Sequence, residues 1–166
     1  MSPLPSRVLL DNTVVSSLHV AAALRELLEL WEGRWIVPLL VRNEAAAWTT
    51  HGARVVSLLD SLHHRGVLSY ASPEPGPEGA LFAELSRTRG QGESAAIAIA
   101  FYRQAAVATD DRLARRSCEL LNPPVATLST EKLLTIAVAD GLLAAARARE
   151  IWSLTGIRDP SRDIQI

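Results

Sequence analysis

Carboxylates stand just after two short apolar segments of this sequence. Asp11 follows the segment 7–10, and Asp110 and Asp111 follow the segment 105–108 after a single threonine. If both segments are parallel strands of one sheet, their carboxyl ends meet at the edge where ligands bind, beside the point at which the strand order reverses. The first strand lies next to that point in the common order 2-1-3-4-5 and its relatives. We therefore expect Asp11 and Asp111 to be close neighbours.

Two glutamates belong to the same predicted edge. Glu44 lies early in a helix predicted over 41–50, and Glu93 opens a helix after the break at 90–92. A helix antiparallel to its strand has its N-terminus at the carboxyl end of that strand. Like charges gathered there repel and raise pKa values unless a cation is present. Oxygen ligands without histidine or thiolate suit Mg²⁺ or Mn²⁺, so a divalent-metal site is the chemistry that these residues could perform.

Each of these acids also has an ordinary structural role when taken alone. Glu93 at a helix N-terminus meets the helix dipole favourably. Asp11 could cap a strand end, and Asp110 or Asp111 could cap a helix. Glu44 alone suits a solvated surface. The separated segments taken together, in their order along the chain, favour a shared site.

The elements that would position these residues alternate along the chain. Strands are predicted at 7–10, 35–37, 67–70, 105–108 and 125–128, and helices at 18–31, 41–50, 55–62, 80–87, 93–101, 112–121, after the cap 129–131, and at 141–154. This alternation is typical of parallel βαβ units with helices on both faces of the sheet. We predict an α/β fold, a three-layer α/β/α sandwich with a central, mostly parallel five-stranded sheet. One domain over 1–166 is expected, with a Pro/Gly-rich surface loop at 72–79 and a C-terminal tail at 156–166.

Composition narrows the class of protein. The chain has 166 residues, 48% apolar and 21% charged, which is ordinary for a soluble globular protein. The net charge of −1 gives no global basic field, so contact with nucleic acid requires a local patch. Arg112, Arg115 and Arg116 could hold phosphate, although such a cluster is often a solvated helix face. A single cysteine, Cys118, excludes a disulfide framework, and no apolar run has the length of a membrane span, so we expect a cytoplasmic protein.

Four motifs in this sequence resemble those of the PIN-domain family, and within it the VapC-type toxin ribonucleases. They are LLDNT at 9–13, the Pro-containing turn from Val37-Pro38 to Glu44, GESAAIA at 92–98 and ATDDRLAR at 108–115. The motifs span most of the chain in the family's order. Two positions depart from the pattern, because Asn12 stands where threonine or serine is common and Ala96 where an acidic residue is frequent.

The resemblance implies a metal-dependent endoribonuclease that binds one or two Mg²⁺ or Mn²⁺ ions. The catalytic carboxylates would be Asp11, Glu44, Glu93 and Asp111, and the metal ligands would be these four together with Asp110. Thr13 and Thr109 would support them. Whether Asp110 or Asp111 is the main ligand stays open, although the family pattern favours Asp111.

The resemblance also implies partners, and two other functions compete with cleavage. An RNA substrate, a small antitoxin protein and a homodimer follow by analogy with the family. The first alternative is a non-catalytic PIN-like module that binds nucleic acid or protein through an incomplete site. The second, a dehalogenase-type phosphatase, needs another aspartate two positions after Asp11, where the sequence has Thr13.

Overall fold

The computed structural model describes residues 4–157, which build a five-stranded sheet whose strands are all parallel. The strands are β1 (Val8–Leu10), β2 (Trp35–Pro38), β3 (Leu68–Ala71), β4 (Ala106–Ala108) and β5 (Thr127–Leu128). Their order is β3-β2-β1-β4-β5, not 2-1-3-4-5. The order still reverses beside β1, between β1 and β4, so the predicted neighbourhood of their carboxyl ends is confirmed.

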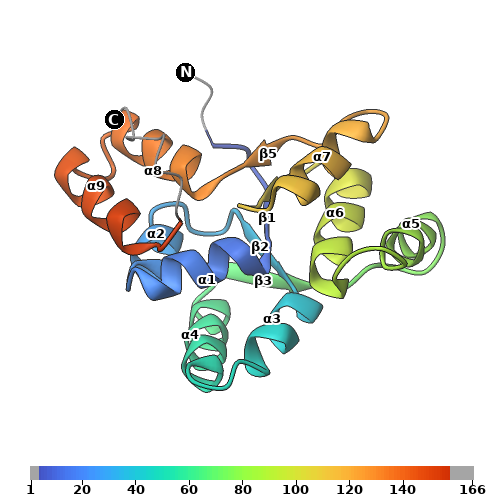
Figure 1. The fold of residues 1–166 in the computed structure, drawn as a ribbon, viewed down its shortest axis with the longest axis horizontal. Coiled ribbons are helices and arrows are strands. Elements are labelled where there is room, and N and C mark those ends of the chain that lie inside the picture. Colours follow the sequence, from blue (N-terminus) through green and yellow to red (C-terminus); the bar gives the residue numbers. More distant parts are fainter. Residues whose placement is uncertain (1–3, 158–166) are drawn as a thin grey trace.

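Helices connect and flank the strands. They are α1 (Asn12–Val20), α2 (Leu24–Glu29), α3 (Leu39–Ala46), α4 (Gly52–His64), α5 (Pro77–Leu85), α6 (Gln91–Arg103), α7 (Arg112–Leu120), α8 (Thr130–Ala139) and α9 (Ala145–Leu154). Figure 1 shows α5, α6 and α7 on one side of the strands and α1, α2, α8 and α9 on the other. The predicted three-layer α/β/α architecture is confirmed.

Strand alternation divides the core between the two faces of the sheet. Val8 and Leu10 pack with α1, α2, α4 and α8, whereas Leu9 packs with the buried side chains of α6. This is the two-residue period of a strand that is buried on both faces. Helix α6 is buried along nearly all of its apolar length, as expected for a helix between the sheet and α5.

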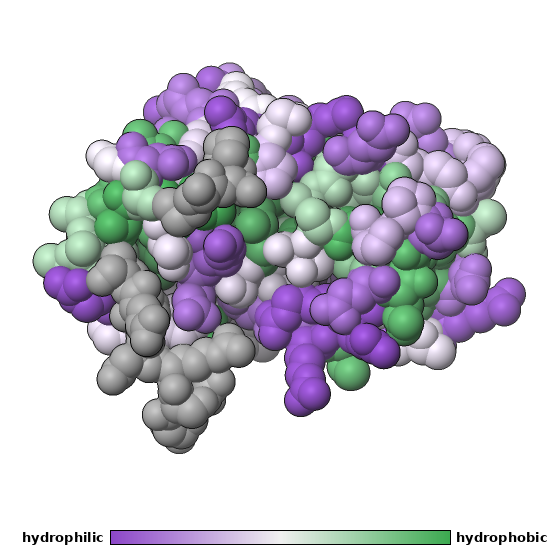
Figure 2. Space-filling view, turned by 90° about the horizontal axis from the view of Figure 1, so that it is seen from above, coloured by the Kyte–Doolittle hydropathy of each residue, from purple (hydrophilic) through white to green (hydrophobic). Residues whose placement is uncertain are grey.

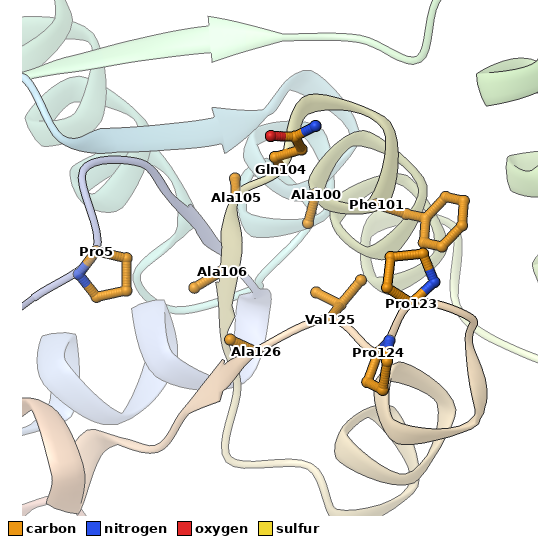
Figure 3. Close-up of a pocket in the computed structure, with 10 residues that line it drawn as sticks. All are labelled: Pro5, Ala100, Phe101, Gln104, Ala105, Ala106, Pro123, Pro124, Val125 and Ala126. Atoms are coloured by element: carbon orange, nitrogen blue, oxygen red, sulfur yellow. The ribbon is translucent and has the colours of Figure 1, made fainter. Parts of the chain in front are cut away.

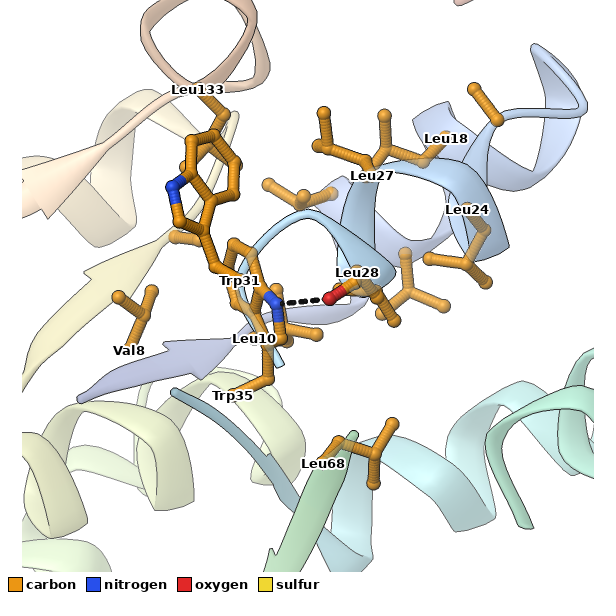
Figure 4. Close-up of a cluster of buried hydrophobic side chains, with 14 of the residues drawn as sticks. Val8, Leu10, Leu18, Leu24, Leu27, Leu28, Trp31, Trp35, Leu68 and Leu133 are labelled. Carbon is orange, nitrogen blue, oxygen red and sulfur yellow. Dashed lines mark hydrogen bonds between the residues drawn. The ribbon is translucent and has the colours of Figure 1, made fainter. Parts of the chain in front are cut away.

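Two tryptophans anchor the first of these cores. Trp35 of β2 is fully buried, and its Nε1 donates to the carbonyl oxygen of Leu28 at 2.9 Å (Figure 4). The ring of Trp31 meets that of Trp35 edge-on, with the centroids 5.9 Å apart. Buried indole N–H groups need such a partner, so this hydrogen bond fixes the end of α2 against β2.

A charged cluster joins α3, α4 and β3 at the other edge of the sheet. Arg42 donates to both carboxylate oxygens of Asp60, at 2.7 and 2.6 Å, and the hydroxyl of Tyr70 donates to the same carboxylate at 2.6 Å. These donors, with Arg42 the strongest influence, lower the pKa of Asp60 to about 2. The cluster therefore links three consecutive elements, and the stability that it contributes depends on the ionised form of Asp60.

The region after β1 differs most from its prediction. A single helix over 18–31 was expected, but α1 already begins at Asn12 and a break separates it from α2. Val14, Val15 and Leu18 are all buried on one face of α1, so burial outweighs the weak helix propensity of the β-branched pair. The break falls at Ala22, which has a φ of 53°, a conformation that the alanine-rich sequence does not signal.

Other boundaries move by a few residues. Helix α3 ends at Ala46, so Glu44 lies near the end of the helix. The prediction that Glu44 lies early in this helix was wrong. The predicted surface loop at 72–79 is shorter, because α5 begins at Pro77, a residue that suits the first turn of a helix. The last helix begins at 145, not 141. Most of the predicted tail at 156–166 lies outside the described residues.

Candidate active site

The carboxyl ends of β1 and β4 are joined by their backbones. Leu10 is paired with Ala108, and the amide N–H of Asp11 donates to the carbonyl oxygen of Ala108 at 3.0 Å. The chain leaves β1 directly into α1 and leaves β4 through Thr109 to Asp111 before α7 begins. This geometry brings the motif around Asp11 against the motif around Thr109.

Two threonines fix the Asp11 carboxylate. The hydroxyls of Thr13 and Thr109 both donate to Oδ2 of Asp11, each at 2.8 Å. The same hydroxyls accept from the backbone N–H groups of Asp110 and Asp111, at 3.0 and 3.1 Å. Asp11 is only 3% exposed, and no described residue donates to its Oδ1. The predicted supporting threonines thus hold one oxygen of Asp11 and leave the other open to a ligand.

Asp110 is committed to structure through both of its oxygens. Its Oδ1 accepts from the backbone N–H of Thr130 at 2.8 Å, and its Oδ2 accepts from the hydroxyls of Thr130 at 2.7 Å and Ser17 at 3.1 Å. These bonds tie the end of β4 to the N-terminus of α8 and to α1. Asp110 therefore has no carboxylate oxygen without a protein donor. This distinguishes it from Asp111 as a candidate for the main metal ligand.

Asp111 is the N-cap of α7. Its Oδ1 accepts from the backbone N–H groups of Leu113 at 2.6 Å and Ala114 at 3.0 Å, while no described residue donates to Oδ2. Capping stabilises the start of the helix and fixes the orientation of the carboxylate. The helix cap predicted for Asp110 or Asp111 is confirmed for Asp111. The capping hydrogen bonds use only one of its two carboxylate oxygens.

Glu93 comes to this edge from the first turn of α6. Its Oε1 forms an ion pair with the guanidinium of Arg89 at 3.0 Å, and its side chain is 17% exposed. Burial raises the pKa of Glu93; Arg89 opposes this rise, and the charges of Asp11 and Asp111 add to it. Glu93 therefore lies near enough to both aspartates for their charges to act on it.

Glu44 reaches the same helix from α3. Its Oε1 accepts from the backbone N–H of Gly92 at 2.7 Å, so its carboxylate lies on the N-terminus of α6. A Cβ atom at Gly92 would lie only 2.6 Å from Oε2 of Glu44. The glycine of the GESAAIA motif thus provides the space that lets the Glu44 carboxylate reach the N-terminus of α6.

The oxygen donors at this edge fit a hard divalent cation in kind. Asp11, Asp111, Glu93 and Glu44 each keep one carboxylate oxygen to which no described residue donates. The buried amide oxygen of Asn12, beside Asp11 in the sequence, also has no hydrogen-bond partner. Within residues 4–157, however, no group of three or more His, Cys, Asp or Glu side chains is arranged to hold a metal ion.

The three predicted phosphate-binding arginines differ in their positions. Arg115 is partly buried, and its guanidinium lies 3.3 Å from the carbonyl oxygen of Thr109, directly at the site. Arg116 pairs with Glu119 at 3.3 Å on the exposed side of α7. Arg112 is exposed and makes no ion pair among the described residues. Of the three, Arg115 is tied most closely to the carboxylate edge.

A separate hollow of about 280 Å³ lies at the opposite end of β4 (Figure 3). Its walls include Phe101, Gln104 and the turn 123–126, and no titratable side chain lines it. It offers no acid, base or metal ligand. Figure 2 shows hydrophilic and hydrophobic side chains interspersed over one face of the molecule.

The fold is that of an α/β protein with a wholly parallel sheet between two layers of helices. The carboxylates lie at its switch point, which is where ligands bind in open sheets of this class. The sequence pattern of the PIN domain matches residues 7–151, and the chain belongs to the PIN-domain family. A comparison with curated proteins found no match. None of the helices in residues 4–157 is both long and apolar enough to cross a membrane.

Three residues of the site were not anticipated from the sequence. Ser17 and Thr130 hold Asp110, and Arg89 holds Glu93. Arg89 lies outside the helix predicted over 93–101, so its spacing of four residues from Glu93 was no helical ion-pair signal. Ser17 and Thr130 gave no signal either, because they reach Asp110 from elements that are far away in the sequence.

Proposed function

We propose that this protein is a metal-dependent endoribonuclease whose site is formed by Asp11, Glu44, Glu93 and Asp111. The PIN domain is a nuclease-type fold, and these residues belong to the four motifs that resemble the family. The observation that carries the proposal is the joining of the carboxyl ends of β1 and β4, which brings Asp11 against Thr109 and Asp111. Glu93 lies near enough that, after burial as the largest cause, the charges of both aspartates raise its pKa. Like charges brought together from separate segments repel one another, and a bound cation would neutralise this repulsion.

Mg²⁺ or Mn²⁺ is the proposed cofactor because all of the donors are oxygens. Asp11 and Asp111 would be held in place by their threonine and backbone donors, and Glu93 and Glu44 would complete the ligand set from α6 and α3. Bound there, the ion would activate a water molecule and stabilise negative charge on the scissile phosphate. Asp110 would not be a principal ligand. It would support the site by holding the end of β4 to α8.

The substrate and partners are part of the same proposal. RNA is the proposed substrate, with Arg115 as the first candidate for a phosphate contact because it lies against Thr109. By analogy with the toxin ribonucleases of the family, a small antitoxin protein would bind the chain, and the chain would form a homodimer in the cytoplasm.

A non-catalytic PIN-like binding module is the second candidate function. The observation in its favour is the absence of a preassembled metal-binding group among residues 4–157. In this alternative, the Arg89–Glu93 pair would be a permanent structural contact. Ala96, at a position where the family often has an acidic residue, agrees with a reduced ligand set.

Cleavage of RNA in the presence and absence of metal separates these two functions. Purified protein is incubated with structured and unstructured RNA in Mg²⁺, Mn²⁺ or EDTA, beside Asp11→Asn and, as a matched control, Asp140→Asn at an exposed aspartate. We expect cleavage that requires metal, survives in the control and disappears in Asp11→Asn. Cleavage that persists in EDTA or in Asp11→Asn would exclude this site. RNA binding without cleavage in every metal would favour the binding module.

A further inference from the structure

Arg89 is the one basic side chain that is paired with a proposed metal ligand within residues 4–157. It lies just before α6, and its guanidinium is 3.0 Å from Oε1 of Glu93. The side chain is 21% exposed, so it reaches the carboxylate from the rim of the site. A neighbouring arginine, Arg87, is exposed and makes no ion pair among the described residues.

The position of Arg89 is that of a counter-ion. Glu93 comes to the edge that also holds the carboxylates of Asp11 and Asp111, and Arg89 is the basic group that pairs with it, at 3.0 Å. A divalent cation bound to the same carboxylates would supply that positive charge instead. Repulsion between the cation and the guanidinium would then act against the Arg89–Glu93 pair.

We propose that Arg89 is a substrate-positioning residue that exchanges Glu93 for an RNA phosphate when a divalent cation binds. This inference rests on the proposed function and adds a residue that is outside the carboxylate set. The exchange needs no change of fold, because Arg89 precedes the first turn of α6 and its side chain is partly exposed. An arginine fork matches two phosphate oxygens as well as it matches a carboxylate, so the released guanidinium has a suitable partner beside the metal.

The first test measures the metal. Mn²⁺ binding is followed by electron paramagnetic resonance in the wild-type protein, in Arg89→Gln and in Arg87→Gln, which removes the same charge two residues away. We expect Arg89→Gln to bind Mn²⁺ about fivefold more tightly than Arg87→Gln, because the cation no longer displaces an ion pair. Equal affinities in the two variants would overturn the exchange. A wild-type protein that binds no Mn²⁺ would instead overturn the proposed function.

The second test measures RNA under the same conditions. Binding of labelled, phosphorothioate-linked RNA is followed by fluorescence anisotropy with Mn²⁺ and with EDTA. In Mn²⁺, Arg89→Gln is expected to bind RNA about fivefold more weakly than Arg87→Gln, whereas in EDTA the two variants bind alike, because Glu93 then retains the guanidinium. A deficit of the same size in both media would overturn the proposal, since it would show a contact that is independent of the metal.

Discussion

Replacing Asp110 should destabilise the fold more than replacing its neighbour Asp111. Asp110 accepts three hydrogen bonds, two from Thr130 and one from Ser17, at 2.7 to 3.1 Å. A hydrogen bond to a charged group contributes about 1.5–3 kcal/mol, but bonds to one partly exposed carboxylate are not additive, so we expect Asp110→Ala to cost about 3 kcal/mol. For a chain of this length, that corresponds to a fall in Tm of about 6–12 °C.

Two matched substitutions, at Asp111 and Asp140, separate the effect of Asp110 on stability from that of other aspartates. Asp111→Ala removes a helix N-cap, worth about 1 kcal/mol, and should lower Tm by about 2–4 °C. Asp140→Ala at an exposed aspartate serves as the control and should leave Tm nearly unchanged. Calorimetry gives the stability of each variant, and Mn²⁺ titration of the folded proteins should give the opposite ranking, with the larger loss in Asp111→Ala. A greater loss of stability in Asp111→Ala, or a folded Asp110→Ala that has lost Mn²⁺ binding, would refute the division of roles between them.

Three further changes test other parts of the structure. Thr109→Val removes the hydroxyl that donates to Asp11 and should cost about 2–3 kcal/mol in urea denaturation; an unchanged midpoint would contradict that bond. Gly92→Ala should displace the flexible Glu44 carboxylate and weaken Mn²⁺ binding while changing stability by no more than about 1 kcal/mol, and a larger loss would show that backbone had moved instead. The pKa of Asp60 is lowered to about 2, so the stability that this carboxylate contributes is complete above its unfolded pKa near 4 and is lost as pH falls toward 2. The difference in Tm between the wild type and Asp60→Asn should therefore narrow between about pH 4 and about pH 2. A constant difference in Tm would exclude the linkage between Asp60 and stability.

The predictable part of the fold is the part that sequence periodicity determines. Short apolar runs bounded by turn residues identified all five strands, because a strand that is buried on both faces is apolar at consecutive positions. The start of α1 was missed since Val14 and Val15 suit a strand as well as a helix, and only their packing against the sheet decides between the two. The bend at Ala22 also depends on tertiary contacts, because alanine elsewhere favours a continuous helix.

The meeting of these carboxylates at one edge of the sheet was predictable from the sequence, but their contacts were not. The position of Asp11 after a strand, and that of Glu93 at a helix start, placed them at one edge because parallel topology fixes where strands end. The different roles of Asp110 and Asp111 could not be read from the sequence, since they depend on which side chain meets Thr130, twenty residues further along the chain. The pairing of Glu93 with Arg89 depends in the same way on side-chain directions.

The most direct test of a shared cation at Asp11, Glu93 and Asp111 is a crystal of the protein grown with Mn²⁺ and measured for anomalous scattering. We expect one strong peak at the carboxyl ends of β1 and β4, with carboxylate oxygens of these residues about 2.0–2.6 Å from it. Glu93 should then have left Arg89. A folded protein in saturating Mn²⁺ with no peak at this edge, and with the Arg89–Glu93 pair intact, would contradict the proposed metal site.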